Sequence, residues 1–192
     1  MPPKAKITRE MILDAAYEIV RKLGAENVNA RSIAKSLGCS TQPVLYYFAT
    51  VEEIKKAVYA RADAFHTEYI TDIRPERGDP MLQIGSNYIR YAAQERNLFR
   101  FLFQSNGFQD KGFIELIDAP ELAPVLFVLR QAAGVGEKQA KDVFCSIFLV
   151  AHGYASLFAN NAMEYNEDAI DAQLQKAFIG AVYAAREEED NV

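Results

Sequence analysis

The sequence predicts an all-α protein in which a small N-terminal three-helix domain with a helix-turn-helix is fused to a larger helical domain. Apolar residues recur at three- and four-residue steps in almost every periodic segment, and no run alternates as a strand would. Two short helical segments are joined by a tight turn at Gly38, which is the pattern of a helix-turn-helix. We place the small domain at residues 1–50, extending into the start of the fourth helix, and the larger domain at residues 51–192.

Capping residues define the first two helices. We expect Thr8 to cap a first helix that ends at Gly24, because a hydroxyl side chain can accept from the free N–H groups of the first turn. Asn29 is expected to cap a second, short helix in the same way. The buried face of the first helix is expected to comprise Ile12, Ala15, Ala16, Ile19 and Leu23, and that of the second Ile33, Ala34 and Leu37.

The third helix is expected to follow a glycine corner. Gly38 can adopt the positive φ that reverses the chain within a few residues. Ser40 is expected to cap a helix that runs from Thr41 to Phe48. Pro43 would then be its third residue, where the backbone N–H lacks a helical partner anyway.

The rest of the chain is predicted to be helical, with one long helix followed by shorter ones. Asp79 and Pro80 are typical of a cap followed by proline at the first helical position. The apolar stretch Phe144–Ala159 is shorter than the roughly 20 residues of a bilayer span, so we interpret it as a buried or interface helix. The expected helices are Val51–Ile73, Pro80–Arg96, Leu98–Ser105, Pro120–Ala133, Glu137–Asn161 and Glu167–Glu188.

The net charge of −5 is unevenly divided. Residues 1–50 carry seven Lys/Arg and four Asp/Glu, a balance of +3, and the remaining 14 basic and 22 acidic residues give −8. A basic N-terminal part on an acidic body favours a polyanionic partner at one end only. With no secretion signal and only two widely separated cysteines, we expect a cytoplasmic protein with reduced thiols, without membrane association.

Nothing in the sequence favours an enzyme. It has two histidines, His66 and His152, and lacks a Ser/His/Asp set, a phosphate-binding glycine loop and a metal-spaced His/Cys cluster. We therefore expect no catalytic residues, no metal and no cofactor.

Residues 8–58 resemble the DNA-binding domain of the TetR (tetracycline-repressor) family. The resemblance rests on the capped first helix, Ile33–Ala34, Gly38, Ser40 and Phe48 at the family's spacing. It implies a ligand-responsive regulator, with repression as the default output. A regulator of this kind is a homodimer that binds a near-palindromic operator in double-stranded DNA. A small, mainly apolar effector releases it from the DNA. The chain departs from the family at Leu45 and Val51, where Tyr and Lys are usual.

The resemblance also implies roles for the DNA-facing side chains. Gln can pair bidentately with adenine, and a Thr methyl can meet a thymine methyl. The alternative is that Tyr46 and Tyr47 pack against the fourth helix and Ser40 is only a cap, whereas Phe48 is expected in the core. Base contacts are assigned to Arg31, Thr41, Gln42 and Tyr46, and phosphate contacts to Thr8, Ser40, Tyr47 and Lys55, with the arm of Lys4 and Lys6 along the duplex.

The larger domain is expected to hold an aromatic ligand pocket and the dimer interface. For the aromatic residues the alternative is an ordinary core, and a lone His on an apolar helix is often structural. The candidate ligand residues are Tyr88, Tyr91, Phe99, Phe103, Phe127 and His152. By resemblance, the last two helices form the dimer interface through Phe144, Ile147, Ala151, Phe158, Leu174, Phe178 and Val182.

One alternative function remains open. A helical protein–protein adaptor that has lost DNA binding would also fit the sequence, and the substitutions at Leu45 and Val51 favour it.

Overall fold

A computed structural model describes residues 7–104, 117–118, 120–161 and 163–190. Over these ranges the chain is helical without any strand, so the predicted all-α class is confirmed. The chain divides into two compact units. The head unit comprises Met1–Thr67 and Glu95–Gly107, and the body unit comprises Glu68–Gln94 and Phe108–Val192. These units are defined by packing, and the functional boundary expected at residue 50 stays a prediction.

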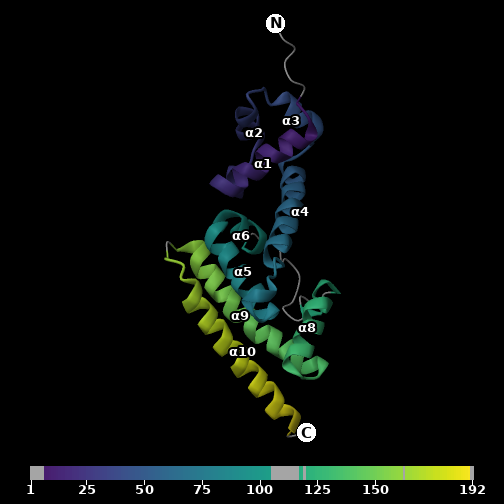
Figure 1. The fold of residues 1–192 in the computed structure, drawn as a ribbon. Coiled ribbons are helices and arrows are strands. Elements are labelled where there is room, and N and C mark those ends of the chain that lie inside the picture. The colour runs from purple at the N-terminus through teal and green to yellow at the C-terminus, as the bar shows by residue number, and fades with distance from the viewer. Residues whose placement is uncertain (1–6, 105–116, 119, 162, 191–192) are drawn as a thin grey trace. The chain divides into compact units, whose positions relative to one another are not determined.

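The head unit contains the three predicted N-terminal helices (Figure 1). Its elements are α1 (Arg9–Leu23), η1 (Ala25–Asn27), α2 (Ala30–Leu37), α3 (Gln42–Tyr47), most of α4 (Val51–Ile70) and α6 (Arg96–Phe103). Thr8 caps α1 as expected, because its hydroxyl accepts from the N–H of Met11 at 3.2 Å. The expectation that Leu23 lies in the core is wrong. Leu23 is 61% exposed, because it lies in the last turn of α1.

Polar contacts attach α6 to α1 within the head unit. The Arg21 guanidinium donates to Glu95 (Nε to Oε2, 2.8 Å), and the Asn97 amide donates to the Arg21 carbonyl at 2.9 Å. The hydrogen bond with the Glu95 carboxylate raises the pKa of Arg21. On α4, the Tyr59 hydroxyl donates to the carbonyl of Leu102 at 3.3 Å. Hydrogen bonds of side chains therefore link the α6 segment to both α1 and α4.

The body unit is built on α5 (Pro80–Gln94), α9 (Glu137–Asn160) and α10 (Glu167–Asp190), which pack together (Figure 1). The remaining elements are η2 (Pro75–Arg77), η3 (Pro120–Leu122) and α8 (Ala123–Ala133). The predicted helices are present, with ends shifted by a few residues. The largest shifts are at α4, which ends at Ile70 rather than Ile73, and at α8, whose predicted first turn is the separate η3.

Helix α9 is long and apolar enough to cross a membrane by length and composition alone. In the described part of the chain it packs against α5, α8 and α10, and Val143, Ala151 and Ala155 are buried among them. Because core helices of globular units pass the same test, we interpret α9 as the central helix of the body unit.

Candidate DNA-binding surface

Local hydrogen bonds fix the start of α2. The Asn29 side-chain oxygen accepts from the N–H of Arg31 at 3.1 Å and of Ser32 at 2.9 Å. In return, the Ser32 hydroxyl accepts from the Asn29 N–H at 3.1 Å, which completes a capping box. The predicted cap at Asn29 is therefore confirmed, and α2 begins at a position fixed by its own sequence.

A glycine corner separates α2 from α3, as predicted. Gly38 is left-handed, with φ 62° and ψ 33°, a conformation that costs other L-residues free energy. The Cys39 N–H donates to the Ala34 carbonyl at 3.0 Å, which closes the end of α2. The corner therefore reverses the chain within a few residues.

The expected cap of α3 at Ser40 is wrong. The helix begins at Gln42, and Thr41 is the residue before it, with no side-chain hydrogen bond to the first turn. Thr41 already has helical φ and ψ, and its carbonyl accepts from the Leu45 N–H at 3.1 Å. Pro43 consequently lies at the second helical position, where a proline still removes no hydrogen bond. Ser40 is exposed.

Helix α3 has one buried side and one exposed side. Val44 is fully buried and Phe48, just after the helix, is 3% exposed, so the expectation that Phe48 is core is confirmed. On the other side Tyr46 is 81% exposed and Leu45 is 57% exposed. Gln42 is also exposed, and Thr41 is partly buried. The side chains assigned to base contacts on α3 are thus accessible, although their role stays a prediction.

The residues assigned to phosphates come from four places in the head unit: the start of α1, the turn before α3, α3 itself and α4. Thr8 and Ser40 are exposed, Tyr47 and Lys55 are partly buried, and Arg31 is exposed on α2. The ring of Tyr47 meets that of Tyr46 edge to face, with centroids 5.1 Å apart. Lys4 and Lys6 lie outside the described residues. The Arg9 guanidinium, directly after the Thr8 cap, lies 4.7 Å from the Phe48 ring centre.

Among the predicted ligand residues, Tyr88 and His152 meet within the body unit. The Tyr88 hydroxyl and His152 Nδ1 are 2.8 Å apart. Burial raises the pKa of Tyr88 and lowers the pKa of His152. A neutral Tyr can therefore donate to a neutral imidazole here. Tyr91 is fully buried, with its ring 5.4 Å from that of Tyr69.

The other predicted ligand residues lie elsewhere. Phe99 and Phe103 belong to the head unit, where Phe103 contacts the rings of Phe99 and His66, each with centroids 5.0 Å apart. Burial lowers the pKa of His66 to about 4. Phe127 is 62% exposed on α8. The structure therefore divides the predicted aromatic set between the two units.

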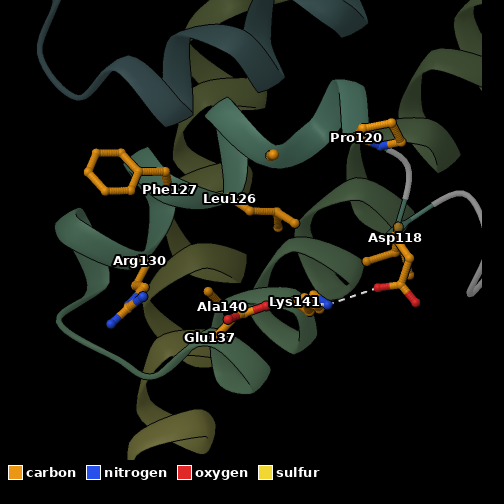
Figure 2. Close-up of a pocket in the computed structure, with 10 residues that line it drawn as sticks. Asp118, Pro120, Leu126, Phe127, Arg130, Glu137, Ala140 and Lys141 are labelled. Carbon is orange, nitrogen blue, oxygen red and sulfur yellow. Dashed lines mark hydrogen bonds and ion pairs between the residues drawn. The ribbon is translucent and has the colours of Figure 1, made fainter.

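A cavity of about 330 Å³ lies against α8 and the start of α9 (Figure 2). Of the predicted ligand residues, only Phe127 lines it. Lys141 points toward Asp118, and their charged atoms are 2.9 Å apart (Figure 2). The pairing raises the pKa of Lys141. The cavity combines apolar walls, including Leu126 and Ala140, with an ion pair that sequence reasoning missed because its partners are far apart in the chain.

The side chains assigned to the dimer interface belong mostly to the core of the body unit. Ile147, Ala151, Phe158, Leu174 and Val182 are buried within one chain, and Phe144 and Phe178 are partly buried. In the single chain these five side chains pack inside the body unit, and their assignment to the dimer interface stays a prediction. The large apolar side chains that α9 and α10 expose are Leu149, Leu157, Ile179 and Tyr183.

No protein-family model matches this chain. It is 23% identical over 174 residues to the uncharacterized HTH-type transcriptional regulator YobS of Bacillus subtilis (strain 168), a match that covers 90% of each chain. Among solved structures, it resembles a TetR-like transcriptional regulator from Rhodococcus sp. RHA1 with a TM-score of 0.63 and 14% identity, over 90% of this chain and 96% of that one.

Fold and local geometry together define the class. The chain is all-α, and its capped helix α2 is joined to α3 by a left-handed glycine turn. This geometry places it in the class of helix-turn-helix proteins. Within that class, the chain has the fold of the TetR-like regulators, and both comparisons support the resemblance found in residues 8–58.

Proposed function

We propose that this protein is a dimeric transcription regulator that binds a near-palindromic operator through α3 and is released by a small, mainly apolar effector. The observation that carries the proposal is the outward side of α3, with Leu45 and Tyr46 exposed while Val44 and Phe48 anchor the helix. The similarity to regulators along nearly the whole chain supports it. We propose that it acts in the cytoplasm and that its output is repression.

The proposed DNA contacts follow from the position of each side chain. Thr41, Gln42 and Tyr46 are proposed to reach base edges in the major groove, with Arg31 beside them. Thr8, Ser40, Tyr47 and Lys55 are proposed to contact phosphates and so to set the register of the head unit on the duplex.

The proposed dimer uses the outer side of the last two helices. Leu149 and Leu157 on α9, with Ile179 and Tyr183 on α10, are exposed in the single chain. Cβ atoms added at Gly153 and Gly180 would meet nothing within 4 Å, so a second helix can approach there closely. A twofold dimer would place two α3 helices roughly 34–36 Å apart, one turn of DNA, which requires a near-palindromic site.

Two places in the body unit suit an effector. The cavity beside α8 offers Leu126 and Phe127 as apolar contacts and Lys141 as a charged end. The Tyr88–His152 pair offers a polar handle in apolar surroundings. An effector would release DNA by binding more tightly to a conformation in which the two α3 helices are wrongly spaced. We propose that α4 transmits this change, since it follows α3 directly.

The proposal is tested by DNA binding of the full chain. Fluorescence anisotropy with its own upstream region, in a salt series, should show affinity that falls steeply as salt rises. Gln42→Ala should weaken operator binding by roughly five- to hundredfold, and Gln131→Ala, an exposed glutamine on α8, should leave it unchanged. Light scattering should give twice the chain mass. Absence of salt-sensitive binding to any duplex would contradict the proposal.

The second candidate function is a protein–protein adaptor that has lost DNA binding. An exposed leucine and tyrosine on α3 would equally suit an apolar partner surface. This adaptor would be monodisperse and folded but would show no salt-sensitive shift with DNA, so the same titration separates the two functions.

A further inference from the structure

The exposed side of α3 carries no positive charge. The sequence has no Lys or Arg between Lys35 and Lys55, so the cations of the described head unit lie on α1, α2, α4 and α6. Arg31 and Lys35 are exposed on α2. The helix proposed to enter the major groove therefore meets the bases with uncharged side chains only.

The bases present different chemical groups in the major groove, and each group prefers a different kind of side chain. Guanine presents two acceptors, N7 and O6, and its commonest partner is a bidentate Arg or Lys. Thymine presents a methyl group that packs against apolar side chains, and adenine presents a donor–acceptor pair that Gln matches. Among the exposed side chains of α3, Leu45 and Tyr46 suit the methyl group of thymine, and Gln42 suits adenine.

The helix is held firmly enough for apolar contacts to discriminate between bases. Val44 and Phe48 fix its inner side, and the left-handed Gly38 sets the angle at which it leaves α2. The Tyr46 ring rests edge-on against Tyr47, so part of its rotational freedom is already lost before DNA binds. Leu45 projects from the same exposed side.

We infer that the base pairs beneath α3 are A·T pairs, read through thymine methyl groups by Leu45 and Tyr46 and through adenine by Gln42. Any guanine contact by a cationic side chain would lie outside α3, next to Arg31. This inference rests on the proposed function, since it describes the operator that the same surface would bind.

The inference is tested on duplexes selected from a random library by the full chain. In the selected half-site, each contacted thymine is replaced by uracil, which removes the 5-methyl group and leaves base pairing intact. Each replacement should weaken binding about three- to fivefold, as expected for one buried methyl-sized group. At the positions beneath α3, the selected half-site should contain no guanine whose replacement by 7-deazaguanine weakens binding, because no side chain of α3 contacts N7.

A matched pair of leucine variants assigns the methyl contact. In Leu45→Ala, thymine and uracil duplexes should bind equally at one position of each half-site. Leu23→Ala removes an equally exposed leucine of the head unit and should retain the full thymine preference. Thermal unfolding of Leu45→Ala should match that of the unsubstituted protein, which would show that this variant is folded.

The outcomes separate the two levels of the proposal. A selected half-site whose α3 contacts are guanines sensitive to 7-deazaguanine, with no response to uracil, would overturn the inference and leave the regulator function intact. A library that yields no enriched, salt-sensitive sequence would overturn both.

Discussion

The surface of α3 and the outer side of α9 and α10 both expose large apolar side chains. The two surfaces differ in which contacts determine the buried side of each helix. Helix α3 is short, and its single buried stripe, Val44 with Phe48, leaves only one way to orient it. Helix α9 has two apolar stripes. One contains Ile147 and Ala151 and is buried, and the other contains Leu149 and Leu157 and is exposed. In α3 the buried stripe is limited to Val44 and the adjacent Phe48, whereas in α9 the neighbouring helices decide which of two stripes is buried.

The largest expected effect concerns the anchor of α3. Phe48→Ala should lower the free energy of unfolding by about 3–5 kcal/mol, because it empties a buried aromatic site. Tyr46→Ala should change it by less than about 0.5 kcal/mol, because that ring is exposed. Urea unfolding followed by circular dichroism measures both. Equal losses in the two variants would mean that α3 is not oriented as described.

A second pair of variants applies the same comparison to α10. Leu174→Ala should cost about 2–5 kcal/mol, because Leu174 is fully buried and lies beside Gly85 of α5. Ile179→Ala, at an exposed position, should instead weaken self-association in sedimentation experiments. The proposed interface on the outer side of α9 and α10 would be refuted if Ile179→Ala left the dimer unaffected while a surface variant elsewhere dissociated it.

His66 is a polar side chain of α4 that the neighbouring helices bury, so its burial also depends on tertiary packing. Its pKa is about 4 in the folded protein against an ordinary 6.5, so between these values the unfolded chain binds the extra proton. Stability from this group is present above pH 6.5 and falls by about 1 kcal/mol per pH unit as the pH drops toward 4. Urea unfolding at several pH values should show a shallower decline for His66→Leu. Parallel declines would argue against a buried, neutral His66.

The smallest effect is expected at the glycine corner. Gly38→Ala should cost about 1 kcal/mol, since the left-handed backbone strains a side chain although there is open space for one. Gly38→Asn should cost less, because Asn tolerates that conformation better. Thermal unfolding of the three proteins tests the order. A reversed order would show that the corner does not keep its left-handed geometry in solution.

Local signals predicted the head unit well because they act within a few residues. The caps at Thr8 and Asn29 and the turn at Gly38 are confirmed, since each depends on one side chain and the adjacent backbone. The cap at Ser40 was wrong by one residue, because Thr41 adopts helical geometry itself and needs no side-chain hydrogen bond.

Long-range signals were weaker in the body unit. Hydrophobic periodicity located α9 and α10 but could not tell which stripe faces the chain's own core, and five of the residues assigned to the dimer interface are buried within one chain. The ion pair of Lys141 with Asp118 and the contact of Tyr88 with His152 join residues far apart in sequence, and no spacing pattern announces them.

The sequence by itself determined the all-α class and the helix-turn-helix, because caps and a glycine corner act locally. Only the tertiary structure decided which side of α9 and α10 is buried, where His66 lies and which residues line the cavity beside α8. The physical reason is that burial depends on the neighbouring helices, and an apolar residue fits a core and an interface equally well.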